Sequence, residues 1–446
     1  MRTLSAPFWC LILAVAVPAA GADWPQWRGP DRTDVAKETG LLKTWPKGGP
    51  TLAWSYAQTG VGYSGPAVVS DRLFILGTRG ELECLIALDA VSGKEIWCTN
   101  IGPIFGFKGN SWGDGPRSTP TIDGSQVFAL GAQGILLSAD KATGKPIWQK
   151  DLATELGGAI SPHGGGPDKI GWGYSESPLV DGDQVVCTPG GAQGTLAALD
   201  KSTGKVRWRS KELTDAATYA SAVVTEIAGA RQYIQMTDRG VVGVAAKDGR
   251  LLWRYLRKPA YPEDTFVIPT PIVFGNEIYT TTSAGCDLIG IAAQGGKFKA
   301  VKTYSNKNMK NQTGGVLLAG DHVFGFSDGR GWVCQKLANG ELAWSEKRQL
   351  GRGSLTCVDD RLYCYGEDDG KSILVQATAE GWKECGRLEL PRQSQLRKPN
   401  GKCWTHPVVA NGRLYLRDQE NLFCFDIRDQ ASDRRKYAAS SPIPFR

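Results

Sequence analysis

The stretch Ala198-Leu199-Asp200-Lys201-Ser202-Thr203-Gly204-Lys205-Val206-Arg207-Trp208 holds the most informative phrase of this chain. In it, Asp200 can accept hydrogen bonds from turn amides, and Gly204 can adopt the positive φ that the turn requires. A phrase repeated at intervals of about 50 residues is typical of repeat folds, where such residues hold the repeats together. A glycine followed four residues later by a tryptophan occurs at Gly93–Trp97, Gly144–Trp148, Gly204–Trp208, Gly249–Trp253 and Gly340–Trp344.

A tight polar turn that leads into an alternating strand provides a second repeated phrase. Asp-Gly and Asn-Gly turns between strands of period two predict β-hairpins. Together the two phrases predict units of four strands, and four-stranded sheets repeated around an axis form a β-propeller. The eight copies of the turn phrase are Ser70 to Phe74, Asp123 to Phe128, Asp181 to Val186, Gly229 to Tyr233, Gly275 to Tyr279, Gly320 to Phe324, Asp359 to Tyr363 and Asn411 to Tyr415.

The two ends of the repeat region predict how the ring closes. The eighth unit ends after three strands, near residue 427, and lacks a tryptophan strand. An orphan strand, Thr51 to Tyr56, precedes the first unit and carries Trp54. Pairing the two would complete the eighth blade and remove exposed sheet edges. We therefore expect an all-β, eight-bladed propeller of four-stranded antiparallel blades over residues 51–427, closed by the N-terminal strand.

The first 22 residues have the features of a secretory signal peptide. Arg2 precedes an apolar stretch from Phe8 to Val17 that is too short to span a bilayer, and small residues precede a cleavage site near Ala22/Asp23. Cys10 lacks the small residues that precede a lipoprotein cysteine. We expect export to the periplasm or beyond, with neither a lipid anchor nor a membrane span.

Three other segments lie outside the repeats. Residues 23–50, rich in Trp, Pro and Gly, are expected to wrap the surface, and residues 428–446 form a polar tail. Residues 151–175 form an insertion before the third unit, and a long loop of this kind is often functional or disordered.

Charge and cysteine content exclude two classes of protein. The formal net charge of +7 is small for 446 residues and forms no basic stripe, so no nucleic-acid partner is expected. Ten cysteines follow Cys10, a density far below that of a disulfide scaffold. Cys84 and Cys98 are predicted on neighbouring strands of one hairpin, so they could pair. The alternative is that most cysteines are small buried hydrophobic residues.

The repeat phrase at residues 87–97 and 198–208 resembles that of the pyrroloquinoline-quinone (PQQ)-like propeller superfamily. Trp-Pro-Gln-Trp-Arg-Gly-Pro at residues 24–30 resembles a frequent opening of its exported, uncharacterised bacterial members. The resemblance implies an eight-bladed fold and leaves several functional branches open. Quinoprotein dehydrogenases hold PQQ over the axis with calcium, use an Asp base, and in many cases have two adjacent cysteines. A second branch is a non-catalytic lipoprotein scaffold of outer-membrane assembly.

This chain departs from both branches. It contains no Cys-Cys dipeptide and no Cys-x-x-Cys-His haem motif. It also lacks the lipid-attachment cysteine of the scaffold branch. The absence of His-x-x-His and Cys-x-x-Cys spacings argues against zinc. His163 and His322 are expected in an exposed loop and an exposed turn.

Polar and aromatic residues at the starts of inner strands, or in the loops before them, are the candidates for the axial channel. A quinone would need an aromatic ring to stack on and Arg, Asn or Gln to hold its carboxylates. Calcium would need several oxygen ligands, such as Glu176 with Asn311. The alternative is that each residue caps a blade or a loop. The candidate cofactor-binding residues are Trp172, Glu176, Asn311, Trp404, His406 and Arg417, followed by Tyr174, Gln312, Asp418 and Gln419.

These patterns favour a non-catalytic exported propeller that acts as a binding scaffold for an envelope protein or cell-surface component. A complete structural repeat without an electron-transfer or metal motif motivates this hypothesis, which assigns no catalytic residue, no metal ligand and no cofactor. The alternative is a PQQ-dependent dehydrogenase that oxidises an alcohol or sugar with PQQ and calcium.

Overall fold

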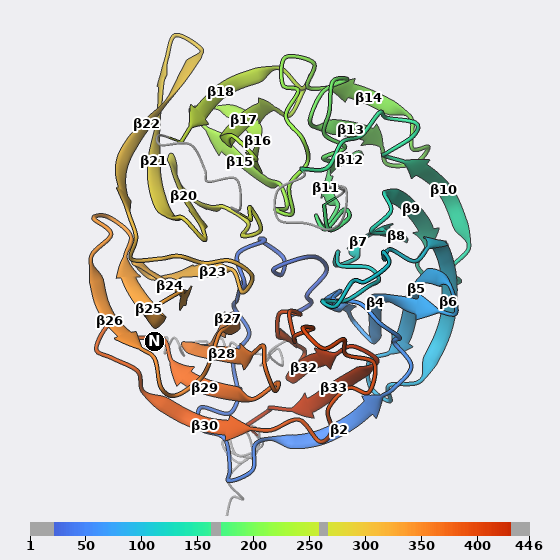
Figure 1. Cartoon of the computed structure of the whole chain (residues 1–446), viewed down its shortest axis with the longest axis vertical. Coiled ribbons are helices and arrows are strands. Elements are labelled where there is room, and N and C mark those ends of the chain that lie inside the picture. Colours follow the sequence, from blue (N-terminus) through green and yellow to red (C-terminus); the bar gives the residue numbers. More distant parts are fainter. Residues whose placement is uncertain (1–21, 162–170, 258–265, 430–446) are drawn as a thin grey trace, which may run out of the picture.

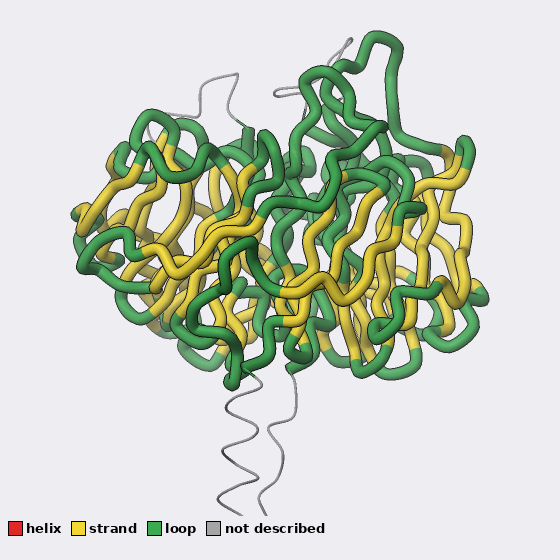
Figure 2. The backbone as a smooth tube through the Cα atoms, turned by 90° about the horizontal axis from the view of Figure 1, so that it is seen from below, coloured by secondary structure: helices red, strands yellow, loops and turns green. Residues whose placement is uncertain are grey.

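The computed structural model describes residues 22–161, 171–257 and 266–429. These residues form eight sheets arranged around a ring and contain no α-helix, which confirms the eight-bladed propeller (Figure 1). Seen edge-on in Figure 2, the ring is a thick disc whose strands lie between two layers of loops. No helix in the described ranges could cross a membrane. The predicted signal peptide up to residue 21, His163 and most of the polar tail lie outside these ranges.

The first four blades follow one another along the chain, each as an antiparallel meander. Their strands are β3 (Ala67–Val69), β4 (Arg72–Arg79), β5 (Leu82–Asp89) and β6 (Glu95–Pro103); β7 (Thr121–Asp123), β8 (Gln126–Leu130), β9 (Ile135–Asp140) and β10 (Pro146–Asp151); β11 (Leu179–Asp181), β12 (Gln184–Cys187), β13 (Ala197–Asp200) and β14 (Val206–Arg209); and β15 (Val223–Ile227), β16 (Ala230–Thr237), β17 (Gly240–Ala245) and β18 (Leu251–Leu256).

The remaining blades continue in the same order, and the seventh sheet gains a short parallel strand, β1 (Val35–Ala36), beside β27. Their strands are β19 (Ile272–Phe274), β20 (Glu277–Thr282), β21 (Gly285–Gln294) and β22 (Lys297–Asn306); β23 (Val316–Ala319), β24 (His322–Ser327), β25 (Gly331–Lys336) and β26 (Leu342–Glu346); β27 (Gly353–Val358), β28 (Arg361–Gly366), β29 (Ser372–Gln376) and β30 (Glu384–Leu388); and β31 (Val408–Ala410), β32 (Arg413–Asp418) and β33 (Asn421–Asp426), completed by β2 (Thr51–Tyr56).

The ring closes as the sequence predicts. β2 pairs antiparallel with β33, with Thr51 opposite Asp426 and Tyr56 opposite Leu422. The eighth blade is therefore made from both ends of the repeat region, and β33 has no exposed edge.

Tryptophans of the repeat join neighbouring blades at the outer edge of the ring. Trp54 of the eighth blade lies over Gly93 of the first, and a Cβ at Gly93 would come within 2.6 Å of the indole. Trp97 lies over Gly144 in the same way. The Trp54 Nε1–H donates to Ala90 O (3.0 Å) in the next blade. Two requirements favour glycine at these positions. A side chain would collide with the indole, and the backbone has a positive φ, which is 72° at Gly93.

Two blades lack the tryptophan, and the structure fills its place in two ways. In the fifth blade, Tyr304 packs on Gly340 of the next blade, and its hydroxyl donates to Leu337 O (2.8 Å). In the seventh blade, the equivalent position is Gly386. Trp45 of the N-terminal segment packs directly on it, with its ring centroid 5.9 Å from that of Tyr363. The N-terminal segment thus supplies the missing ring of the seventh blade.

Residues 23–50 were expected to wrap the surface, and the structure corrects this expectation. The segment crosses the middle of the ring, as the blue trace in Figure 1 shows. Trp24, Arg28, Arg32 and Asp34 are each at most 3% exposed. The segment enters the channel because its backbone and buried polar side chains find hydrogen-bond partners there.

We call residues 24–42 the axial segment, because they contact the inner part of every blade. Backbone bonds join the axial segment to blades one, two, seven and eight, as in the bridge from Trp24 to Val68. Arg32 donates to Ser177 O and Ala222 O, which precede the inner strands of blades three and four. Arg28 donates to Thr270 O and Val316 O of blades five and six. One segment therefore ties all eight blades together at the axis.

The backbone of the axial segment is strained where its charged side chains reach these carbonyls. Arg28, Arg32 and Asp34 have φ values of 63°, 55° and 58°. A non-glycine residue in this region costs about 1–3 kcal/mol and is kept only when its surroundings compensate. Arg28 pairs with Asp34 (2.6 Å), and both side chains are 1% exposed.

The ten cysteines in the described ranges are free thiols. Eight are buried, as expected of small hydrophobic residues, and Cys98 and Cys385 are partly exposed. Cys84 and Cys98 lie near each other, and a hydrogen bond from Cys84 lowers the pKa of Cys98.

Candidate ligand-binding pocket on the propeller axis

A cavity of about 370 Å³ opens above the axial segment, within the range of small-molecule sites. The lining combines aromatic rings, hydroxyl and amide groups, two arginines and one histidine, and the described part of the chain places no carboxylate on it. The lining residues are Trp27, Tyr63, Trp112, Arg117, Trp172, Ser175, Ser177, Tyr219, Phe266, Ile268, Gln312, Thr313, Arg352, Trp404 and His406.

Every blade contributes to this pocket from the same place. Each inner strand is preceded by a loop, and that loop carries a lining residue, because the starts of the inner strands meet at one face of the ring. In blade order these residues are Tyr63, Arg117, Trp172, Tyr219, Phe266, Gln312, Arg352 and Trp404.

The floor of the pocket is made by Trp27 and His406. Their ring centroids are 4.5 Å apart. The Nδ1 atom of His406 lies 3.6 Å from the Oδ2 atom of Asp34, which is itself paired with Arg28. Gly315 leaves room for the imidazole, since a Cβ there would lie 2.8 Å from His406 Cε1. The axial segment therefore closes the pocket at the bottom and positions its histidine.

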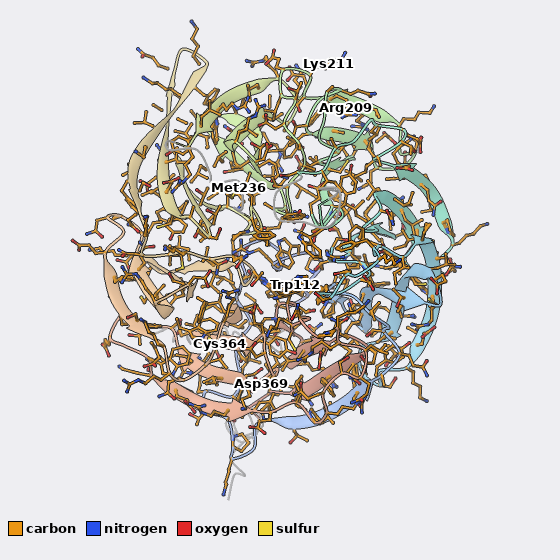
Figure 3. The ribbon with its side chains drawn as sticks, in the orientation of Figure 1. Trp112, Arg209, Lys211, Met236, Cys364 and Asp369 are labelled. Atoms are coloured by element: carbon orange, nitrogen blue, oxygen red, sulfur yellow. The ribbon has the colours of Figure 1, made fainter. Side chains whose placement is uncertain are left out.

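Three aromatic rings form one wall of the pocket. Trp112 and Trp404 stack with an interplanar angle of 25° and a centroid distance of 6.1 Å, and Tyr63 lies 5.0 Å from Trp404. Trp112 is 43% exposed, and Figure 3 shows it at the centre of the ring. The Nε1–H of Trp404 donates to the buried Glu367 (3.0 Å), which fixes the indole.

Two loops hold Trp112 over the axis. One connects the first two blades and carries Trp112, and the other connects blades seven and eight. They are joined by Asn400, whose amide N–H donates to Ser111 O (2.9 Å), and by an ion pair between Lys398 and Asp114 (3.0 Å). The exposed indole therefore has a supported backbone.

The two arginines of the pocket differ in their partners. Arg352 pairs with Asp328 (2.7 Å) and lies 3.8 Å from Glu367. Arg117 donates to the carbonyls of Gly113 and Gly115, and its guanidinium lies 4.8 Å from the ring centroid of Phe105. Burial lowers the pKa of Arg117. No described carboxylate lies within salt-bridge distance of Arg117, so its positive charge is not neutralised by an ion pair within the described structure.

Three of the six predicted cofactor-binding residues line the pocket: Trp172, Trp404 and His406. Gln312, from the second group of candidates, joins them. His406 is 6% exposed, so it is both packed and part of the pocket floor.

The other three, Glu176, Asn311 and Arg417, are buried away from the lining and bind the scaffold. Glu176 accepts from Thr188 N and lies near Arg32; burial raises its pKa to about 7. Asn311 donates to Gly315 O (2.9 Å) and Phe326 O (3.0 Å).

Arg417 donates to Ser64 O (2.9 Å) and Leu76 O (2.7 Å), which joins blade eight to blade one. The secondary candidates Tyr174, Asp418 and Gln419 have structural roles as well. The hydroxyl of Tyr174 donates to Pro189 O, Asp418 pairs with Arg397, and the side-chain oxygen of Gln419 accepts from Gly62 N.

The most informative residues that the sequence analysis missed are Arg117, Trp27, Trp112 and Tyr63. Arg117 and Tyr63 precede inner strands, as Trp172 does, so the same positional rule could have found them. Trp27 could not be found in this way, because its segment enters the ring from outside the repeats.

Comparison with known proteins agrees with this architecture. The family described as outer membrane protein assembly factor BamB matches residues 83–346. The BamB protein of Yersinia pestis is 24% identical over 226 residues, which are 50% of this chain and 52% of that protein. The quinoprotein ethanol dehydrogenase of Pseudomonas aeruginosa is 28% identical over 232 residues, 45% of this chain and 34% of that enzyme. The chain thus matches about half of the first relative and about a third of the second.

Among solved structures, the quinohemoprotein alcohol dehydrogenase of Comamonas testosteroni superposes with a TM-score of 0.61 at 12% identity, covering 95% of this chain and 82% of the enzyme. This likeness supports the fold alone. Because the family match covers more than half of the sequence and the ring has eight blades, the chain belongs to the BamB-type family of the PQQ-like eight-bladed β-propeller superfamily.

Proposed function

We propose that this chain is a non-catalytic, exported binding protein of the cell envelope and that its binding site is the axial pocket. The observation that supports this proposal is the pocket lining, which offers rings, arginines and neutral polar groups but no described carboxylate. Such a surface can bind and orient a ligand. Among the described residues, this lining holds no Asp or Glu that could act as the base of a quinoprotein dehydrogenase.

The envelope location rests on the relatives and on the N-terminal sequence. The relative in Yersinia pestis is named an outer membrane protein assembly factor, and the first 22 residues read as a signal peptide. The proposed partner class is an envelope protein or a cell-surface component that meets the pocket face of the ring.

The alternative is a PQQ-dependent dehydrogenase, and the pocket fits only part of that cofactor set. Rings such as Trp404 and arginines such as Arg117 suit a flat polyacid. Calcium does not fit, because it prefers several oxygen ligands and the described lining holds no carboxylate. Of the predicted ligands, Glu176 accepts hydrogen bonds from Thr188 N and Gln235, and neither Glu176 nor Asn311 lines the pocket. No metal-binding group of three or more His, Cys, Asp or Glu residues is found in the described ranges.

The test is reconstitution of the purified mature chain with PQQ and calcium chloride, followed by dye-linked oxidation of ethanol and glucose. A quinoprotein dehydrogenase of known activity serves as the positive control. We expect no dye reduction. Saturable PQQ binding accompanied by dye reduction would overturn the binding-protein proposal.

A further inference from the structure

The charge of the axial pocket indicates what kind of ligand it can hold. Arg352 is already paired with Asp328 and has Glu367 nearby. Arg117 has no acidic partner within salt-bridge distance in the described ranges, and its hydrogen bonds to Gly115 O and Gly113 O use one N–H of each terminal nitrogen. A guanidinium has five N–H donors, so donors remain for a ligand. Arg117 is therefore the arginine of the described lining that has no ion-pair partner in the described ranges.

The stacked indoles of Trp112 and Trp404 indicate which ligand shape the pocket suits. Trp112 and Trp404 lie nearly parallel, and the exposed ring of Trp112 is supported by the two joined loops. An exposed indole face of this kind covers the apolar face of a flat or ring-shaped molecule. The volume of about 370 Å³ limits the ligand to a small molecule or to the end of a longer chain.

The neutral polar groups distinguish a sugar from an aromatic ring. Ser175, Gln312 and Thr313 line the same cavity as the indoles. A sugar ring offers hydroxyl groups that can pair with them. The hydroxyl of Thr313 already donates to Glu367, and the side-chain oxygen of Gln312 accepts from Arg352. The hydroxyl of Ser175 and the amide N–H groups of Gln312 remain for a ligand, and an aromatic ring would leave them without partners in a desolvated site.

We propose that the axial pocket binds a sugar acid, a saccharide ring that carries a carboxylate, with the carboxylate on Arg117 and the ring on Trp112 and Trp404. This proposal rests on the proposed function, since it names the ligand class of that same site. An arginine fork matches a carboxylate in geometry, and a charge-assisted hydrogen bond is stronger than a neutral one.

The test compares acids with neutral molecules of the same shape. Binding of D-glucuronate, D-glucose, benzoate and benzyl alcohol to the mature chain is measured by quenching of tryptophan fluorescence and by calorimetry. We expect glucuronate to bind at least about tenfold more tightly than glucose, because a charge-assisted hydrogen bond is stronger than a neutral one. Equal binding of glucuronate and glucose would overturn the proposal, as would tighter binding of benzoate.

Two variants locate the carboxylate. Arg117→Gln is expected to remove the preference for glucuronate over glucose, and Arg117→Lys to keep part of it. Lys211→Gln removes a charge at the outer edge of the ring, where Figure 3 shows Lys211, and should leave the preference unchanged. A preference that survives in Arg117→Gln would overturn the role of Arg117.

A variant at Trp112 keeps the proposal testable if Arg117→Gln fails to fold. Trp112→Ala truncates an exposed indole and should weaken the binding of glucuronate and glucose by a similar factor, about threefold to thirtyfold. Unchanged binding of both sugars would overturn the proposal that the sugar ring stacks on Trp112. These outcomes are separate from the PQQ test, since dye reduction overturns the binding-protein function whatever the sugars do.

Discussion

The tryptophans at the outer edge of the ring and the axial segment at its centre both join blades, but they use different chemistry. An outer tryptophan such as Trp148 covers one glycine of the next blade and donates one hydrogen bond to it, to Lys201 O (2.9 Å). The axial segment places buried charges, Arg28 and Arg32, against carbonyls of four blades. A substitution of an outer tryptophan should therefore affect the contact between two blades. A substitution of an axial arginine should leave buried carbonyl groups of more than one blade without hydrogen-bond partners.

Removal of the axial charge should have the largest effect. Arg32→Met is expected to lower the free energy of unfolding by about 3–5 kcal/mol, because it leaves Ser177 O, Ala222 O and the nearby Glu176 without their cation. Urea denaturation followed by fluorescence measures the change. Arg239→Met is the control, since the side chain of Arg239 is 66% exposed. A loss as small as that of the control would contradict the role of the axial segment.

Trp45, which belongs to the N-terminal segment but takes the place of a repeat tryptophan, allows a direct comparison with the outer edge of the ring. Trp45→Ala should lower the free energy of unfolding by about 3 kcal/mol, since it removes a buried indole and its contact with the ring of Tyr363. Substitution of Trp344, a repeat tryptophan of the sixth blade, by Ala should cost a comparable amount, because its ring packs at a similar tilt against Phe324, with a centroid distance of 6.1 Å. If Trp45→Ala proved neutral while Trp344→Ala did not, Trp45 would not replace a repeat tryptophan.

The stability of the protein should depend on pH through Glu176, which is buried near Arg32 of the axial segment. Burial raises its pKa from 4.5 to about 7, so the folded state holds this proton more tightly than the unfolded chain. Its contribution to stability is therefore fully present below pH 4.5 and is lost as the pH rises to about 7. The loss is at most about 3 kcal/mol, at about 1.4 kcal/mol for each pKa unit.

Glu176→Gln should remove this part of the pH dependence. The check is the free energy of unfolding of both proteins at pH 5 and pH 8. We expect the variant to gain stability relative to the wild type at the higher pH. Parallel pH profiles would show that Glu176 does not titrate in this range.

The smallest expected effect concerns thiol reactivity at the edge. The thiolate is the reactive form of cysteine, and a hydrogen bond from Cys84 lowers the pKa of Cys98. Iodoacetamide should therefore label Cys98 faster than Cys364, whose pKa is raised by burial. Cys385, the other partly exposed thiol, is the control for exposure. Cys84→Ala should slow labelling of Cys98, and peptide mass spectrometry would reveal an unchanged rate if the hydrogen bond were unimportant.

The fold could be predicted because its signals are local. Turns such as Asn411-Gly412 have the positive φ values that their residue types favour, 54° and 74°. The pairing of β2 with β33 followed from the missing strand and from Trp54. The pocket was predicted in part, since Trp172, Trp404 and His406 line it whereas Glu176 and Asn311 turn into the scaffold. Neighbouring residues in a loop can face opposite ways, and the strand pattern does not determine which faces the axis.

The repeat phrases alone established the number of blades, the four-stranded unit and the closure of the ring, since each depends on residues that are close in the chain or complementary at its ends. Only the tertiary structure showed that residues 24–42 enter the channel, that Trp45 replaces a repeat tryptophan, and that Arg117 has no ion-pair partner in the described ranges. Those features arise from contacts between residues up to hundreds of positions apart, such as Arg28 with Val316, and no local pattern encodes such a contact.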